Sequence, residues 1–184
     1  FRFVSSCHFT ILKSGKRRAR WAECAGLPTW DLTRKRPWFC WMESYFFYDI
    51  KRFDIKGKEH LRTLGKYYIV DIGLRNFLLG FRNRDSGHAI ENVVYFELLR
   101  RGYDVAIGKA DNSEVDFAAA KMDDRLYVQV TESMVSEDTR RRELAPLQKI
   151  SDNYEKIVLS LDPGLDSSYE GIKSISLISW FVEG

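Results

Sequence analysis

Four side chains in the middle of the chain occupy the places of a site for metal-dependent phosphodiester chemistry, and the first two have the types that this chemistry uses. Glu91 lies in HAIENVVYFELLRRG, Asp116 in SEVDFAAA, and Gln129 and Thr131 in RLYVQVTE. Carboxylates on neighbouring elements can hold a hard cation such as Mg²⁺ through their oxygens. The cation then activates water and stabilises the charge that builds on a phosphate, while a nearby lysine positions the water.

The last of these stretches departs from that chemistry at two positions. A complete site needs Glu-x-Lys there, whereas the chain has Gln129 and Thr131. Glutamine offers a neutral carbonyl oxygen, so one negative charge is lost, and threonine supplies no cation. The degenerate site is therefore expected to be inactive. The active alternative is a Mg²⁺ site with three ligands, Glu91, Asp116 and Gln129, and with Glu114 or Glu132 as helpers.

A helix is predicted to position the first carboxylate. Apolar residues recur at helical spacing, at Ile90, Val93, Val94 and Leu98. Ser86 or Gly87 begins this helix and Gly102 closes it. We expect Glu91 beside the buried stripe and Glu97 on a different face.

A hairpin is predicted to position the other residues. Residues 113–120 and 125–131 alternate polar and apolar side chains, and KMDD at 121–124 has the composition of a turn. In an antiparallel pair with this turn, the polar side chains can meet on one surface, namely Glu114, Asp116, Gln129 and Thr131.

The stretch before the helix that begins at Ser86 or Gly87 has its own pattern. Residues 44–61 alternate around Gly57 and predict a strand pair or the wing of a small β-unit. Residues 67–70 predict a short strand. Asp71 is expected to cap the helix that follows, and Gly80 to end it.

The end of the chain completes an α/β pattern. Residues 136–150 predict a helix in which Pro146 should cause an end or a kink near Ala145. A buried strand at 155–162 and a last strand running into a short helix follow. The order helix, three strands, helix, two strands predicts an α/β fold with a mixed sheet flanked by helices.

Residues 1–44 differ in composition from the rest. They hold four of the five tryptophans, all three cysteines and the cluster GKRRAR. Residues 1–45 carry nine Lys and Arg against three Asp and Glu, whereas the remaining 139 residues carry twenty against twenty-three. The main domain is thus slightly acidic, unlike a broad nucleic-acid surface. We predict an irregular, basic, Trp-rich segment at 1–44 and a folded domain at 45–184.

The cysteines and the lengths of the apolar runs indicate the cellular compartment of the protein. Cys7, Cys24 and Cys40 form no CxxC pair, and an odd, widely spaced set argues against a disulfide framework and a zinc site. No run reaches the roughly 18 apolar residues of a membrane span. A cytoplasmic protein without membrane partners is expected.

The chain from about Tyr45 to Val182 resembles the C-terminal domain of a large group of predicted bacterial and archaeal P-loop ATPases (domain of unknown function 4143). The resemblance is carried by YDIKRFDIKGKEHL, KYYIVDIGLRNFLLG, HAIENVVYFELLRRGYDV, SEVDFAAA, YVQVTES and DNYEKIVLSLD. These stretches are weak one by one and specific as a set. The resemblance implies a PD-(D/E)xK restriction-endonuclease-like fold. In it, Glu91 and Asp116 match the acidic positions, whereas Gln129 and Thr131 occupy the other two without matching them.

The resemblance also implies a missing partner. Relatives carry an ATPase domain and a winged helix upstream, but the chain has no GxxxxGK[ST] motif, and GKADNSE at 108–114 is not one. The expected partner is therefore the P-loop ATPase domain or parent ATPase, and no cofactor other than Mg²⁺ at an active site is expected. Residues 1–44 are then either a misread frame or a truncated winged-helix region.

Three hypotheses follow for the whole chain. The favoured one is a non-catalytic accessory domain in protein contact or nucleic-acid binding; the others are an active Mg²⁺-dependent nuclease and a structural remnant. For nucleic acid, the best basic cluster of the main domain is Arg140, Arg141 and Arg142. A solvated helix end explains that cluster equally well.

Overall fold

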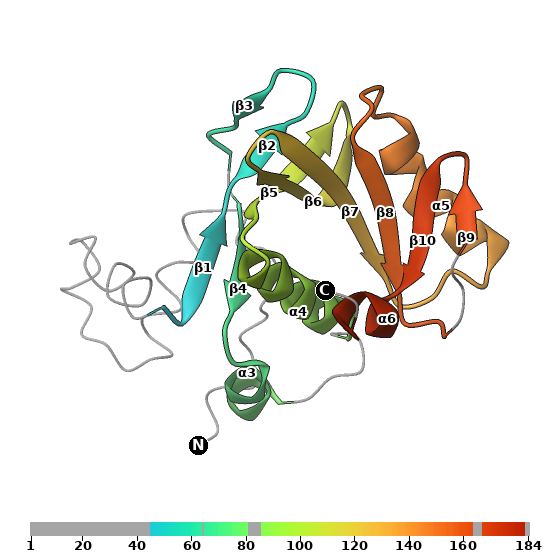
Figure 1. Ribbon diagram of the computed structural model, residues 1–184. Helices are drawn as coiled ribbons and strands as arrows, with labels where there is room; N and C mark the ends of the chain where they lie inside the picture. Colours follow the sequence, from blue (N-terminus) through green and yellow to red (C-terminus); the bar gives the residue numbers. More distant parts are fainter. Residues whose placement is uncertain (1–44, 64, 81–85, 164–166, 183–184) are drawn as a thin grey trace. The chain divides into compact units, whose positions relative to one another are not determined.

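The computed structural model describes residues 45–63, 65–80, 86–163 and 167–182, so the predicted segment 1–44 lies outside the described residues (Figure 1). Contacts divide the chain into two compact units. One consists of Phe1–Asp49 and Lys66–Asn83, and the other of Ile50–Gly65 and Arg84–Gly184. The predicted boundary between residues 44 and 45 stays a prediction.

The smaller unit holds a two-stranded sheet and a short helix. Its elements are β1 (Phe47–Ile50), whose last residue is assigned to the larger unit, β4 (Lys66–Ile69) and α3 (Ile72–Leu79), with β1 paired to β4. The Asp71 carboxylate accepts the Leu74 N–H at 2.9 Å, which satisfies a free donor of the first turn. Gly80 follows the helix with φ of 76°, a conformation that costs glycine little. Both predicted helix ends are confirmed.

An eight-stranded mixed sheet is the frame of the larger unit, in the order β3-β2-β5-β6-β7-β8-β10-β9 (Figure 1). Its strands are β2 (Arg52–Asp54), β3 (Glu59–His60), β5 (Asp104–Ala110), β6 (Ser113–Lys121), β7 (Asp124–Thr131), β8 (Glu155–Ser160), β9 (Ser167–Tyr169) and β10 (Ile172–Ser176). β5, β6 and β7 are antiparallel, whereas β2 runs parallel to β5, β8 to β7 and β10 to β8. The predicted α/β fold with a mixed sheet is confirmed.

The two predicted strand pairs are both present. β2 and β3 pair around Gly57, although β2 also joins the main sheet beside β5. β6 and β7 form the predicted hairpin, with Lys121 paired to Asp124 across the turn and Phe117 paired to Val128. Paired residues face the same side of a sheet, and Val128, the partner of Phe117, is next to Tyr127 in β7. Because side chains alternate along a strand, Phe117 and Tyr127 face opposite sides of the sheet.

Helices cover both faces of this sheet. α4 (Ser86–Arg100) stacks Tyr95 on Phe117, with ring centroids 6.3 Å apart. On the other face, α5 (Glu137–Gln148) packs Leu144 and Leu147 into a core cluster with Tyr127. α6 (Leu177–Val182) lies against β8 and β10. No helix in the described part of the chain is long and apolar enough to cross a membrane.

Of the two effects predicted for Pro146, an end of the helix near Ala145 is wrong, whereas a kink there stays a prediction. α5 continues through Pro146 to Gln148. Proline removes one hydrogen bond of the last turn, but Leu147 is fully buried and its burial holds that turn on the sheet.

The buried face of α4 also differs from the predicted stripe. Val94 and Leu98 are fully buried as expected, but Val93 is 41% exposed. Tyr95 and Glu97 are buried in its place. The predicted helical period is confirmed. Which face of α4 is buried depends on the stacking of Tyr95 on the sheet and on the two arginines that pair with Glu97.

Candidate functional site

A β-bulge lies where the sequence places the site. The register between β5 and β6 shifts by one residue between Ala106 and Gly108, and β6 has one residue more than β5 at this point, within Asp116–Phe117. A bulge interrupts the hydrogen-bond ladder and leaves nearby backbone groups in need of other partners.

The side chains of Asp116 and Gln129 supply such partners. The Asp116 carboxylate accepts the Val130 N–H at 2.9 Å, and the Gln129 carbonyl oxygen accepts the Asp116 N–H at 3.3 Å. Gln129 is buried, and its amide nitrogen donates to the Glu143 carboxylate of α5 at 3.1 Å. The structure thus brings Asp116 and Gln129 together and uses both to join β6 to β7.

The other two predicted site residues have different neighbours. The Glu91 carboxylate, with a side chain 15% exposed, lies 3.8 Å from His88 Nδ1 one turn earlier in α4. The Thr131 hydroxyl is 3.4 Å from the Ser133 carbonyl oxygen, to which it donates a weak hydrogen bond. Thr131 therefore ends β7 as a local turn-forming residue.

The two acids that could have helped an active site are each engaged. Glu114 accepts a hydrogen bond from Arg52 Nε at 2.8 Å, which ties β6 to β2. Glu132 accepts a hydrogen bond from the Ser86 hydroxyl at the start of α4. Glu114 therefore links two strands of the sheet, and Glu132 links the end of β7 to α4.

The donor set predicted for Mg²⁺ consists of two acids and one amide. Within the residues that the structure describes, no group of three or more His, Cys, Asp or Glu side chains could hold a metal ion. The Gln129 oxygen, which would add a neutral ligand to Glu91 and Asp116, accepts a backbone N–H instead.

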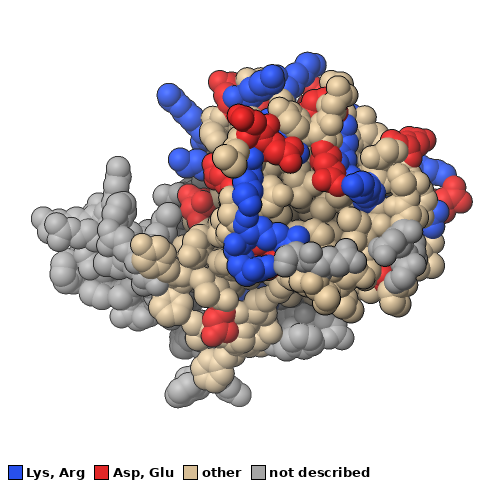
Figure 2. Space-filling view, in the orientation of Figure 1, with Lys and Arg blue, Asp and Glu red and all other residues tan. Residues whose placement is uncertain are grey.

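The predicted basic cluster on α5 is divided among separate contacts. The three guanidiniums bind different groups: Arg140 the Met134 and Val135 carbonyls, Arg141 the Glu137 carboxylate, and Arg142 the Glu143 carboxylate. Arg140 also lies 5.1 Å from the centre of the Tyr169 ring. On the face shown in Figure 2, Lys and Arg are interspersed with Asp and Glu apart from one narrow run of Lys and Arg.

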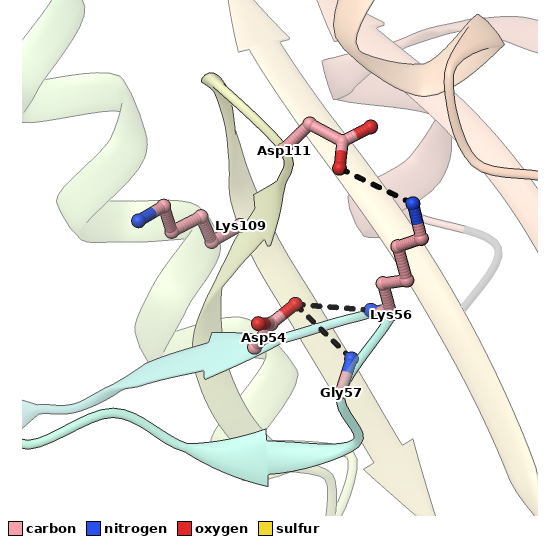
Figure 3. Close-up of a pocket in the computed structure, with 5 residues that line it drawn as sticks. All are labelled: Asp54, Lys56, Gly57, Lys109 and Asp111. Carbon is pink, nitrogen blue, oxygen red and sulfur yellow. Dashed lines mark hydrogen bonds and ion pairs between the residues drawn. The ribbon is translucent and has the colours of Figure 1, made fainter.

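An open polar hollow of about 340 Å³ lies at the β2–β3 and β5–β6 turns (Figure 3). The Asp54 carboxylate accepts the N–H groups of Lys56 and Gly57 at 3.1 and 3.2 Å, and the Lys56 ammonium is 3.6 Å from Asp111. The Lys109 side chain points away from these groups in Figure 3. The charges in the hollow thus stabilise two turns and do not converge on a ligand.

A buried phenol gives a testable contribution to stability. Tyr127 is fully buried, and its hydroxyl donates to the Asp152 carboxylate at 2.6 Å. Burial raises the pKa of Tyr127 to about 12, and the Asp152 hydrogen bond adds to this, while Arg125 opposes it. Tyr127→Phe is expected to lower the free energy of unfolding by about 1 kcal/mol at pH 7.

The pH dependence of this contribution has a definite sign. The folded pKa lies above the ordinary value of 10.0, so the hydroxyl stabilises the fold below pH 10 and the effect is lost as the pH rises toward 12. Urea unfolding at pH 7 and about pH 11 compares wild type with Tyr127→Phe. A difference of equal size at both pH values would contradict the assignment.

Several residues in these contacts were missed by sequence reasoning. Glu143 meets Gln129 from a helix 14 residues away, and Arg125 lies over the Phe53 and Tyr154 rings from other strands and loops. No spacing rule links such positions, because their contacts arise only when the sheet is assembled.

Comparison with known proteins gives one relative. An uncharacterized protein of Haemophilus influenzae is 41% identical to the chain over 140 residues, which is 76% of this chain and 34% of the relative. The chain therefore spans about a third of the length of the curated relative it matches. No family model matches the chain, and no solved structure matches it significantly.

Proposed function

We propose that the chain is a non-catalytic accessory domain of a larger protein, acting in protein contact or nucleic-acid binding. The observation that carries this proposal is the use of Asp116 and Gln129 as hydrogen-bond partners of the β6–β7 backbone. Thr131 stands where a catalytic lysine would position water. The residues that would hold a metal thus accept hydrogen bonds from backbone groups of the sheet.

The larger protein is proposed from two observations. The matched relative is about three times as long as the matched region. The resemblance to the C-terminal domain of P-loop ATPases implies a longer protein that also has an ATPase domain and a winged helix. Membership in the PD-(D/E)xK superfamily and a cytoplasmic location belong to the same proposal, the latter because three widely spaced cysteines suit a reducing compartment.

The proposal is tested by nuclease assays. Purified protein is incubated with supercoiled, linear and branched DNA and with RNA, in Mg²⁺ or Mn²⁺. Wild type is expected to cleave no more than Asp116→Asn, which keeps an oxygen acceptor for the Val130 N–H but loses the charge. Asp123→Asn, in the exposed β6–β7 turn, is the matched control.

One outcome would reverse the conclusion. Cleavage by wild type and by Asp123→Asn that disappears in Asp116→Asn would establish the active alternative. Glu91, Asp116 and Gln129 would then be working ligands of a Mg²⁺-dependent nuclease.

A further inference from the structure

Four planar side chains from separate segments form a continuous series in the larger unit. The His60 and Phe53 rings meet edge to face, with centroids 5.3 Å apart and planes at 69°. The Arg125 Cζ lies 4.7 Å from the centre of the Phe53 ring and 5.7 Å from that of the Tyr154 ring. We name His60, Phe53, Arg125 and Tyr154 the planar stack.

The guanidinium in the planar stack lies beside the Tyr127 hydroxyl, which leaves the others of its five N–H groups for an anion. Arg125 is half-buried, and it forms no ion pair with any residue that the structure describes. The Arg125 guanidinium has aromatic rings as neighbours, and the faces of these rings attract a cation. Nearby carboxylates are engaged elsewhere: Asp152 accepts the Tyr127 hydroxyl, and Glu155 pairs with Lys173 at 2.7 Å.

The two ends of the planar stack are open to solvent. His60 is exposed, and Tyr154 is 41% exposed. Within the described residues, the Tyr154 hydroxyl has no hydrogen-bond partner. Exposed rings beside a guanidinium that has no carboxylate partner among the described residues are the combination on which unpaired bases stack while a phosphate is bound.

We propose that the planar stack binds single-stranded nucleic acid, with bases on Tyr154 and His60 and a phosphate on Arg125. This inference rests on the proposed function and specifies its nucleic-acid branch. Single strands are favoured over duplex because rings stack only on unpaired bases. A slightly acidic domain also lacks the clustered Lys and Arg that a duplex needs.

Fluorescence anisotropy of the full chain tests the proposal. The probes are labelled DNA and RNA single strands of about 12 nucleotides and the matching duplex. Single strands are expected to bind, with a salt slope of about −0.7 to −1.4 for one or two phosphate contacts. Tyr154→Ala should weaken binding about tenfold or more. Arg125→Gln should weaken binding and flatten the slope by about 0.7.

Matched controls separate the site from general effects. Phe77→Ala removes an aromatic ring that is 81% exposed in the smaller unit, and Lys51→Gln removes an exposed cation. Neither is expected to change binding. Tyr154→Leu keeps apolar bulk without the ring, so it replaces Tyr154→Ala if circular dichroism shows that the latter is unfolded.

The failure of this inference differs from the failure of the proposed function. Preference for duplex, absence of single-strand binding at low salt, or equal binding by wild type and the Tyr154 and Arg125 variants would overturn the planar stack as a nucleic-acid site. Absence of single-strand binding would leave a non-catalytic domain that acts in protein contact, whereas preference for duplex or equal binding by the variants would leave one that binds nucleic acid elsewhere. Only metal-dependent cleavage lost in Asp116→Asn would overturn the proposed function itself.

Discussion

Glu97→Ala is expected to lower the free energy of unfolding by about 2 kcal/mol, because it removes the charged acceptor that the half-buried Arg101 and the exposed Arg100 share. Glu97 is 9% exposed and accepts hydrogen bonds from Arg100 at 2.7 and 2.8 Å and from Arg101 at 2.8 Å. Arg101 also binds the Trp180 carbonyl and lies 3.8 Å from the centre of its ring. The carboxylate therefore holds α4 to α6.

The stabilisation by Glu97 depends on acid pH. The hydrogen bond from Arg100 lowers the pKa of Glu97 to about 2, with burial opposing and Arg101 adding to the effect. The folded pKa lies below the ordinary 4.5, so the contribution is complete above pH 4.5 and is lost as the pH falls toward 2. The difference in stability between wild type and Glu97→Gln should shrink between pH 7 and about pH 3 in urea unfolding.

An exposed ion pair is the control for this prediction. Glu137 and Arg141 pair at 3.0 Å in α5 with side chains 80% and 73% exposed. Glu137→Gln is expected to change stability by about 0.5 kcal/mol or less. Equal losses at Glu97 and Glu137 would show that burial between α4 and α6 does not strengthen the Glu97 contacts.

Asp116→Ala is expected to lower the free energy of unfolding by about 2 kcal/mol, the cost of a lost hydrogen bond to a charged acceptor inside a sheet. Its carboxylate is the acceptor for the Val130 N–H at 2.9 Å, next to the bulge in β6. Unfolding in urea measures the global effect. Hydrogen exchange at the Val130 amide measures the local one, and exchange is expected to be faster in the variant.

Two variants sharpen the test of Asp116. Asp116→Asn keeps an oxygen acceptor and should lose less stability than Asp116→Ala. Asp123→Ala removes an exposed carboxylate of the β6–β7 turn and should stay within about 0.5 kcal/mol of wild type. A Val130 amide that exchanges at the wild-type rate in Asp116→Ala would refute the role of the carboxylate in the ladder.

Much of the secondary structure could be predicted because its causes are local. The Asp71 cap requires one carboxylate three residues before an N–H, and the helix end at Gly80 requires one residue with positive φ. The hairpin at 121–124 follows from alternation on each side of a turn. These signals act over a few residues and can therefore be recognised in the sequence.

The site was only partly predictable. The alternating pattern places Asp116 and Gln129 on paired strands, and the two residues do contact each other. Strict alternation along a strand does not predict the bulge in β6, because the bulge depends on how β5 pairs with β6. The engagement of Gln129 by Glu143 depends on where α5 lies on the sheet.

The sequence by itself determined the types of the elements, their order, the hairpin and the residues that stand at the degenerate site. The tertiary structure alone decided that Asp116 completes the β6–β7 ladder, that Glu97 is buried between arginines, and that Arg125 joins rings from distant segments. The physical reason is the range of the forces. Helical and strand periods arise between neighbours in the chain, whereas burial and the pairing of charges arise between surfaces that meet only in the folded protein.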